Sequence, residues 1–455
     1  MASGKSAVKA VYTSDLVTSF DIIKPEVWAS LVKSKGNQAD YFNVIASLGF
    51  KIPTSNVTYE HFEDDWVHES VAAKAPIVIG AAGAVTTFTV ADANVDTNGN
   101  FYVRAKDVLL LQNGTRATVT DITGLVVTIA PFAAADTATV TAADEMAIIT
   151  NMFGEGTDQP LGRFSGTRKY TNNTQIIKEK IKVTGSQMTD GLYFNPIPTY
   201  AGEGGKAVSG SYMIKGQQDA EVRMAILMEG ACLMGRKNTN TTVNKDADTG
   251  KAAKSTEGTI PYIEDNGTTV NYTPGSFTVS KFTQINKVAD KENAPDNYAG
   301  FVGIDLHDTF DDAFIDFNKD FNTSFTSEVT GGKKSIDIGF QFLKRSGRKF
   351  GFSRLKTLSN QKTYGAVGMK YSSWGVFIPL GMNKSMDANG ASSKLPTVGM
   401  RHKSLGGYDR FMEVWTVAGA GNGQKVTEND SHNLSLRSEI GSHNMVGNQM
   451  IIMKP

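Results

Sequence analysis

The sequence has a single cysteine, no long apolar run and no excess of charge of either sign. Cys232 cannot form an intrachain disulfide, and its place in an apolar stretch predicts a buried, unreactive thiol. No apolar run approaches the roughly 20 residues that span a bilayer, and residues 1–10 lead into no signal-peptide core. The 46 basic and 46 acidic residues cancel, which leaves no overall field toward a polyanion or an anionic membrane. We therefore expect a protein that is made in a reducing cytosol and has no membrane partner.

Motifs for catalysis and for metal or phosphate binding are also missing. None of the 6 histidines stands in a His-Glu-x-x-His or Cys/His zinc pattern. The glycine clusters at 154–156, 202–205 and 331–332 lack the spacing of phosphate-binding loops, and tight turns explain them better. We therefore predict no catalytic, cofactor-binding or metal-binding residue, no cofactor and no enzymatic activity.

An acidic run at residues 59–66 is the strongest candidate in the sequence for a catalytic or metal-binding site. Its carboxylates, Glu60, Glu63, Asp64 and Asp65, suggest either a divalent-cation or acid/base site, or a strand whose charged flanks contact a neighbouring subunit. Successive side chains of a strand point to opposite faces and do not converge on one ion, which favours the second interpretation.

Length and composition predict an α+β protein of two or three domains, because 455 residues with 40% hydrophobic content bury a sizeable core. Residues 75–150 are rich in Ala, Val, Thr and Gly, and their apolar residues alternate as in strands. The turn dipeptides Asn98-Gly99, Asn113-Gly114 and Thr123-Gly124 separate the runs. This pattern predicts a small antiparallel β module with strands at 85–90, 102–111, 116–122 and 125–129.

Alternation of period two over residues 170–184 predicts a long extended strand. We expect its partner near residues 59–71, so that the two form a projecting hairpin. The polar tract 238–258 predicts a surface loop, and the stretch from Lys334 onward predicts short strands with glycine-rich turns.

Apolar residues spaced three and four apart predict a long helix over residues 209–234, ended by Gly235 and supported by an Asp219–Arg223 pair. Its second half is apolar nearly all round except for Glu229, which is typical of a buried helix at the centre of a domain. Further helices are predicted over residues 24–33, 40–48 and 309–321, the last capped by Asp308 or Thr309.

A dense basic run contains Lys344, Arg345, Arg348 and Lys349, with phenylalanines nearby. Charge runs of this kind are most often solvated faces, but they also contact nucleic acid phosphates. Both interpretations stay open.

Several short motifs stand in a characteristic order along the chain. They are 155–156 (Glu-Gly), 173–176 (Asn-Thr-Gln-Ile), 183–187 (Val-Thr-Gly-Ser-Gln), the helix end 228–235, 257–263 and 436–440. Taken together, this order resembles that of major capsid proteins with the Hong Kong 97 bacteriophage fold, and general similarity suggests the crAss-like group of tailed phages.

The resemblance implies a division of the chain that composition alone does not give. It comprises an N-terminal arm (1–55), two strands of an extended E-loop arm (56–74 and 151–190) with the β module inserted between them (75–150), a peripheral domain with a long spine helix (191–275), an axial domain (276–420) and a return to the peripheral domain (421–455).

The resemblance also implies a function and partners. Copies of the chain would self-assemble into hexamers and pentamers that form the icosahedral head around double-stranded DNA, so the protein belongs to the virion and is made in the host bacterial cytoplasm. Portal, head auxiliary and scaffold proteins are the implied partners. Residues 1–55 are short for a built-in scaffold, so we expect either a separate scaffold or an unprocessed short form. The implied contacts of the arm with other subunits are Glu60, Glu63, Asp65, Gln175, Lys178 and Lys180, and the implied DNA-facing patch is Lys344, Arg345, Arg348 and Lys349.

Two alternatives compete with a viral shell. An encapsulin-type bacterial compartment has a similar fold and encloses cargo enzymes, although the inserted β module and the longer chain favour a virus. A glycan-binding β-rich surface protein is suggested by the Thr/Asn/Gly-rich module and by Trp374 and Trp415. We expect a signal peptide in a protein of that class.

Overall fold

The computed structural model divides the chain into two compact units, Met1–Tyr59 with Thr171–Pro455, and Glu60–Tyr170. The first is called the body and the second the arm unit. The structure describes residues 41, 51–64, 68–79, 84–96, 98–142, 144–162, 164–189, 211–320, 329–330, 333–334, 342–380, 382–386, 392–420 and 425–455. The predicted helix 24–33 and all but Tyr41 of the predicted helix 40–48 lie outside these residues.

The first sheet of the body is built around one long strand, β25, which pairs on one side with β12 and on the other with β24 and β22. The β12–β25 ladder is antiparallel and runs from Gln175 opposite Ile440 to Thr184 opposite Ser431. β12 ends the strand order and is an edge of this sheet. The strands are β1 (Lys51–Thr54), β12 (Gln175–Thr184), β22 (Val398–Leu405), β23 (Tyr408–Asp409), β24 (Glu413–Ala418) and β25 (Ser431–Asn444).

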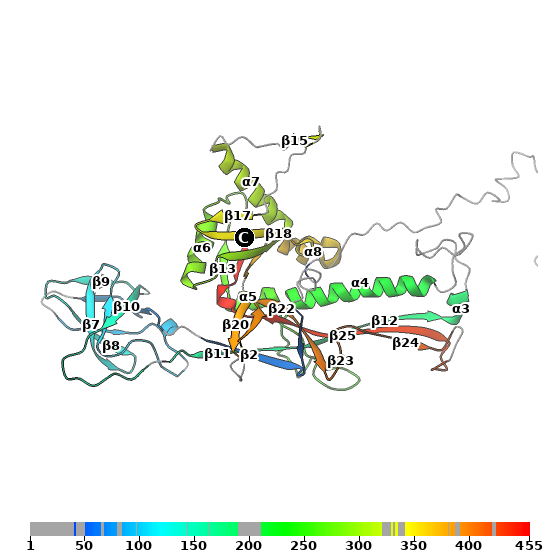
Figure 1. The fold of residues 1–455 in the computed structure, drawn as a ribbon, viewed down its shortest axis with the longest axis horizontal. Helices are drawn as coiled ribbons and strands as arrows, with labels where there is room; N and C mark the ends of the chain where they lie inside the picture. The colour runs from blue at the N-terminus through cyan, green and yellow to red at the C-terminus, as the bar shows by residue number, and fades with distance from the viewer. Residues whose placement is uncertain are drawn as a thin grey trace, which may run out of the picture. The chain divides into compact units, whose positions relative to one another are not determined.

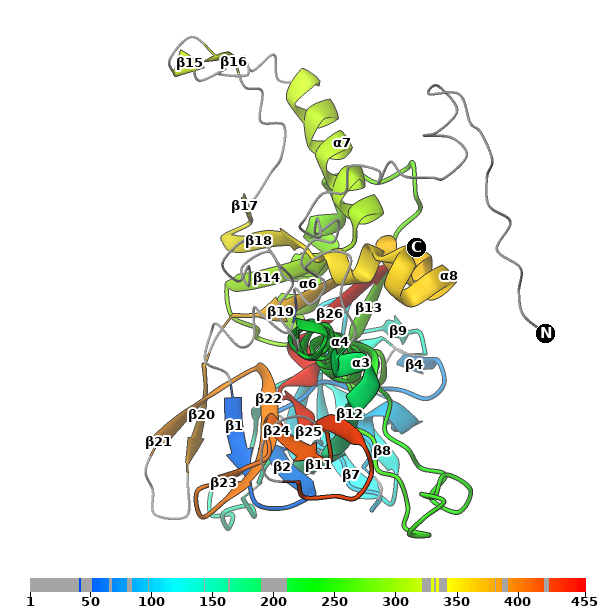
Figure 2. The ribbon, with the colours of Figure 1, turned by 90° about the vertical axis from the view of Figure 1, so that its right-hand side faces the viewer.

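Helix α4 (Ser211–Met234) runs along β12 and β25 and covers one face of this sheet, as Figure 1 shows from the side and Figure 2 shows nearly end-on. Its buried stripe is Ala220, Met224, Met228 and Cys232, spaced four residues apart. It ends at Met234, as Gly235 predicts, because a Cβ at position 235 would lie 2.4 Å from the carbonyl oxygen of Ala231.

The second sheet of the body carries the aromatic core. Its strands lie in the order β13 (Thr268–Asn271), β26 (Ile451–Lys454), β19 (Gly375–Pro379), β14 (Asn297–Val302), β18 (Arg348–Arg354) and β17 (Phe342–Arg345). Phe282, fully buried on helix α6 (Lys281–Lys291), lies at the centre. Its ring centroid is 5.2 Å from that of Phe310, 5.6 Å from that of Phe350 and 5.6 Å from that of Phe352. Burial of several large rings in one cluster is the main stabilisation of this part.

The remaining elements of the body are short or peripheral. The helices are α3 (Gly185–Thr189), α5 (Thr259–Asn266), α6 (Lys281–Lys291), α7 (Ile304–Asp320), α8 (Gln361–Ser372), η2 (Lys356–Ser359) and η3 (Gly447–Gln449). Two hairpins complete it, β15 (Val329–Thr330) with β16 (Lys333–Lys334) and β20 (Met382–Met386) with β21 (Ser392–Pro396). Among the described residues, no helix has the length and apolar content to cross a membrane.

The arm unit contains a closed β barrel. Its sheet has the order β3-β10-β6-β7-β8-β5, and the ends meet because Ala73 bridges Val90, with Lys74 donating its backbone N–H to the carbonyl of Thr89. Closure leaves the main sheet no free edge. The strands are β3 (Val71–Ala72), β5 (Thr86–Thr89), β6 (Asp107–Leu110), β7 (Arg116–Thr123), β8 (Val126–Pro131) and β10 (Glu145–Asn151), beside β4 (Ile77–Ile79), η1 (Asp92–Asn94) and β9 (Ala138–Val140).

The barrel is an insertion between β2 (Thr58–Asp64) and β11 (Thr167–Asn173), and its first and last strands lie next to each other. The chain enters by β3 and leaves by β10, and these strands pair through Val71 with Met146 and Ala72 with Glu145. Before and after them come β2 and β11, which form a two-stranded sheet. Because entry and exit lie side by side, the insertion does not force the two hairpin strands apart.

Several sequence predictions are confirmed. Gly99, Gly114 and Gly124 all adopt positive φ, at 84°, 87° and 61°, as their turn dipeptides predict. Cys232 is buried, and the tract 238–258 forms a largely exposed loop.

Others are wrong, and tertiary contacts explain why. Residues 175–184 pair with β25 and not with β2, whose partner is the preceding strand β11. Helix α7 begins at Ile304, before the predicted cap, and Arg223 pairs with Glu179 of β12, at 3.3 Å, across the helix–sheet interface. In the sheets themselves, β22 to β24 join the first sheet, and β13 and β26 join the second.

Adjacent valines of β8 test the barrel core. Val127 is fully buried and Val126 is 38% exposed. In a purified fragment of residues 71–151, we expect Val127→Ala to lower the free energy of unfolding by about 2–3 kcal/mol, because it removes buried methyl groups and leaves a cavity. Val126→Ala should cost less than about 0.5 kcal/mol. Urea unfolding followed by circular dichroism measures both; equal losses would contradict the assigned interior.

Candidate assembly surfaces

The base of the β2–β11 hairpin is tied to the body by Asn172 and Thr174. The amide of Asn172 donates to the carbonyls of Glu257 and Ser442, at 3.0 and 3.1 Å, and its oxygen accepts from the backbone N–H of Glu257 at 2.9 Å. Thr174 donates its backbone N–H to Val57 at 2.7 Å. Segments distant in the sequence thus meet at one point, which fixes where the hairpin leaves the body.

Tyr59 and Gly441 pack directly at this point. The Tyr59 hydroxyl donates to the carbonyl of Ser442 at 2.5 Å, and burial raises its pKa. A Cβ at position 441 would lie 2.6 Å from that hydroxyl and 2.7 Å from the carbonyl oxygen of Asn173. Glycine is therefore required at position 441, where the backbone of β25 passes under the base of the hairpin.

The face of the first sheet away from α4 carries a row of lysines on its edge strand. Ile181 faces α4, since it is the neighbour of Gly216, so Lys178, Lys180 and Lys182 point to the other side. All are exposed, and among the described residues none has a carboxylate within ion-pair distance. Lys178 contributes to lowering the pKa of the exposed Asp246, after larger effects from hydrogen bonds with Thr249. We call these residues the lysine row.

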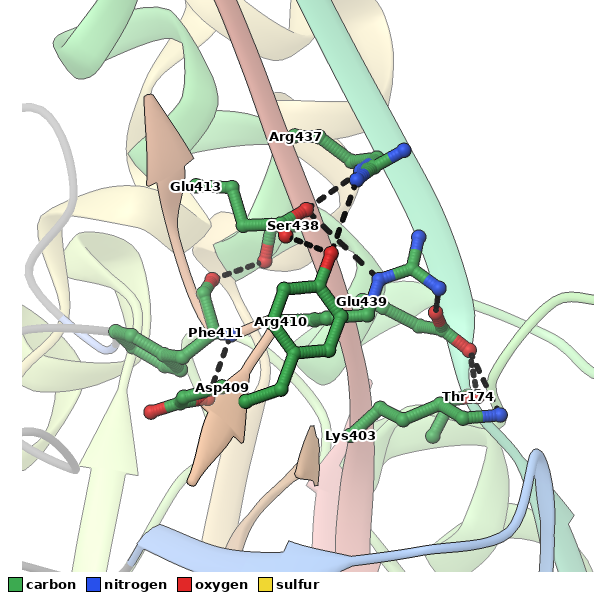
Figure 3. A network of polar contacts seen from close by, with 10 residues as sticks. Thr174, Lys403, Asp409, Arg410, Phe411, Glu413, Arg437, Ser438 and Glu439 are labelled. Atoms are coloured by element: carbon green, nitrogen blue, oxygen red, sulfur yellow. Dashed lines mark hydrogen bonds and ion pairs between the residues drawn. The ribbon is translucent and has the colours of Figure 1, made fainter. Parts of the chain in front are cut away.

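Next to the lysine row, the same face holds a buried ion-pair network (Figure 3). Glu439 of β25 is 2% exposed, and its carboxylate lies 2.7 Å from the guanidinium of Arg410 and accepts from the Thr174 hydroxyl at 3.1 Å. Lys403 lies 3.9 Å from the same carboxylate. A buried carboxylate that lost these partners would be costly, so the network fixes the sheet to the base of the hairpin.

A second part of the network lies nearer the surface. Glu413 of β24 accepts from Arg437 of β25 at 2.6 Å, and this hydrogen bond is the main reason why the pKa of Glu413 is lowered. Arg437 also lies over the ring of Trp415, 5.1 Å from its centroid. These contacts order the polar face that adjoins the lysine row.

Some of the residues predicted to contact other subunits already bind groups of their own subunit. Glu60 pairs with Lys169 across the hairpin at 2.8 Å, Glu63 pairs with His61 at 3.0 Å, and Asp65 lies outside the described residues. Gln175 accepts from the backbone of Thr256 inside the body at 3.3 Å. Lys178 and Lys180 are exposed in the lysine row.

The predicted basic patch is divided by its own hairpin. Ser346 and Gly347 form the turn, with φ of 51° and 88°, and Lys344 lies directly opposite Lys349 on the exposed side. Arg345 is half-buried. The other side carries Arg348.

Arg348 is not available to an outside polyanion, which corrects the prediction for this residue. It is 5% exposed and donates to the carbonyls of Asn286 and Ala294, both at 3.0 Å, and to the Asp290 carboxylate at 2.7 Å. The Arg348 guanidinium thus ties together a carbonyl within α6, a carboxylate on that helix and a carbonyl just beyond its end, which is a structural role.

Two buried polar groups of α4, Cys232 and Glu229, have structural surroundings. Burial, with a smaller effect from Glu229, raises the pKa of the Cys232 thiol to about 12, so the reactive thiolate is suppressed. Glu229, the one acid in the apolar half of α4, is fully buried and accepts from the Thr357 hydroxyl. It links α4 to the η2 segment.

One group of possible metal ligands occurs among the described residues, His307, Asp308 and Asp311 on α7. It needs no ion to explain it, because His307 and Asp311 stand four residues apart on the helix and their side chains lie 3.2 Å from each other.

Residues 38–339 match the sequence model of the SU10 major capsid protein family. The chain belongs to this family. The match covers the whole arm unit and the part of the body from residue 38 to residue 339.

The chain is also similar to solved structures from two phages and to an encapsulin complex. One is from Microbacterium phage Oxtober96, with 11% identity, a TM-score of 0.42, and 96% of this chain and 97% of that chain covered. Another, from Mycobacterium phage Ogopogo, has 9% identity, a TM-score of 0.44 and coverages of 98% and 99%. The holo-SrpI encapsulin complex from Synechococcus elongatus has 8% identity, a TM-score of 0.30 and coverages of 64% and 76%. A comparison with curated proteins gives no match.

The protein is therefore a major capsid protein of a tailed bacteriophage, a structural component of the virion with the α+β Hong Kong 97-type fold. The family match favours this assignment over the encapsulin-type compartment and the glycan-binding protein.

Sequence reasoning missed Glu439, Arg410 and Lys182. The alternation of lysines at 178, 180 and 182 marks a cationic face of one strand, and extending the predicted contacts by one repeat would have found Lys182. Nothing in the sequence near Glu439 indicates that Arg410, about thirty residues away, is its partner.

Arg410 tests the buried network. We expect Arg410→Ala to lower the free energy of unfolding by about 3 kcal/mol, because the buried Glu439 carboxylate would lose its nearest cation. Arg236→Ala, which breaks the exposed pair with Asp265, is the matched control and should cost about 1 kcal/mol or less. Urea unfolding followed by tryptophan fluorescence compares them; a loss for Arg410→Ala no larger than that of the control would refute the role of the network.

Proposed function

We propose that this major capsid protein forms hexamers and pentamers, and that these close into an icosahedral head around double-stranded DNA. Ring-closing, head-to-tail contacts between identical chains give such assemblies without any chemical step. In this proposal the protein has no catalytic activity of its own. It is made in the host bacterial cytoplasm and meets the portal, head auxiliary proteins and a scaffold during assembly.

One observation carries the proposal. In the described part of the chain, β2 and β11 pair only with each other, and Phe62 on β2 is 64% exposed. A two-stranded ribbon is only marginally stable in water. The exposed phenylalanine contributes no hydrophobic stabilisation to it, because its ring stays in contact with solvent. The ribbon gains stability if another subunit covers it, which couples its ordering to assembly.

We assign roles to the parts of the chain on this basis. The hairpin and its inserted barrel act as the E-loop arm between capsomers, α4 with the first sheet as the peripheral domain, and the second sheet with α6 and α7 as the axial domain near the capsomer centre. The membership of the phage in the crAss-like group stays a prediction.

The packaged DNA is proposed to contact Lys344 and Lys349 without sequence preference. These lysines stand opposite each other on one exposed hairpin face, while Arg348 faces inward. Two exposed lysines with no described carboxylate partner suit phosphate contact.

Assembly tests the proposed function. We expect the purified chain, alone or with proteins encoded beside it, to give five- and six-membered rings or closed shells in size-exclusion chromatography and negative-stain electron microscopy. A monomer under every scaffold condition would be incompatible with the proposal.

Salt dependence tests the DNA contact. Lys344→Gln with Lys349→Gln removes two phosphate-binding charges, so the slope of log K against log salt for a short duplex should fall by about 1.8. The control is Lys287→Gln with Lys362→Gln, two exposed lysines elsewhere in the body. If both pairs change the slope equally, the patch has no special role.

A further inference from the structure

Residues 152–162 and 164 of the arm unit expose apolar side chains that nothing described in the subunit covers. Leu161 is 91% exposed and Phe164 is 94% exposed, with Met152 at 50% and Phe153 at 38%. Clustered exposure of large apolar groups on a folded protein marks an interaction surface. We call this stretch the apolar loop.

The apolar loop is held in place by polar contacts. Arg104 donates its guanidinium to the carbonyl of Leu161 at 2.9 Å, and the Thr157 hydroxyl donates to the carbonyl of Gly154 at 2.8 Å. A loop fixed in this way loses less conformational entropy when it binds a partner.

The apolar loop also carries two free acids. Glu155 and Asp158 are exposed, and among the described residues neither has a basic side chain within ion-pair distance. A partner surface should therefore combine positive charge with apolar contact.

The lysine row and its surroundings supply that combination. Lys178, Lys180 and Lys182 point to one side of an edge strand, about 7 Å apart from one to the next. On the same face, β12 exposes Ile176, which is 49% exposed, and β24 exposes Trp415, which is 41% exposed. Protection of the edge against aggregation explains lysines there, but it explains neither the exposed tryptophan nor the exposed phenylalanine of the loop.

We propose that the apolar loop of one subunit binds the lysine row of a second copy of this chain, with Glu155 and Asp158 paired to lysines and the apolar side chains against Ile176 and Trp415. This contact rests on the proposed function and names the residues that make it. It places the arm contact on the apolar loop, whereas Glu60 and Glu63 already have partners inside their own subunit.

Charge reversal with exchange tests the contact. One variant carries Glu155→Lys and Asp158→Lys, and the other carries Lys178→Glu and Lys180→Glu. All four side chains are exposed, so folding should persist, which circular dichroism checks. Under conditions where the wild type assembles, we expect each variant alone to give about tenfold less assembled protein, because like charges then meet at every copy of the contact.

Mixing the two variants should restore assembly, since each reversed loop then meets a reversed row on the other chain. A single chain with all four substitutions should assemble as well. Lys287→Glu with Lys362→Glu, a reversal of two exposed lysines on α6 and α8, is the control and should leave assembly unchanged.

The outcomes are distinguishable. If each reversed variant assembles like the wild type, the contact is wrong while the proposed function stands. Restoration only in the fourfold variant, and not in the mixture, would place the contact within one chain and overturn the proposal. Failure of the wild type itself to assemble would remove the proposed function and this contact together.

Discussion

The antiparallel pairing of β12 with β25 is the constraint on which the rest of the body depends. Its register sets which side chains of β12 face α4 and which carry the lysine row. A shift by one residue would turn the lysines toward the buried face of α4 and expose Ile177 and Val183, so the register is strongly fixed. The same ladder brings Thr174 to Glu439 and thus places the base of the hairpin.

In the arm unit, the constraint is the position of the two ends of the inserted barrel. An insertion of about eighty residues in a thin hairpin would disturb the two strands unless its ends lay together. Pairing of β3 with β10 brings the ends together, and the Ala73–Val90 bridge closes the sheet so that it offers no open edge for unwanted pairing.

A shell protein needs surfaces that are incomplete in the single subunit. In this chain the described surface combines an edge strand with unpaired lysines, a two-stranded ribbon and a loop with exposed aromatic and acidic residues. Buried polar groups such as Glu229 and Glu439, in contrast, are paired inside the body and hold its parts in position. The described carboxylates and lysines of opposite charge that lack such partners lie on the outside.

The sequence by itself determined the local features of this protein: the turns at Gly99, Gly114 and Gly124, the helix that ends before Gly235, the buried thiol and the α+β class. Each depends on residues close together in the chain, where backbone sterics and hydrophobic spacing act directly. Motif order also pointed to a capsid protein, and the family match bears this out. Only the tertiary structure decided that β12 pairs with β25, that Leu227 is exposed while Met228 is buried, and that Arg348 faces inward. Periodicity cannot rank the faces of a helix that is apolar nearly all round, and it cannot identify a strand partner about 250 residues away, because these depend on long-range packing.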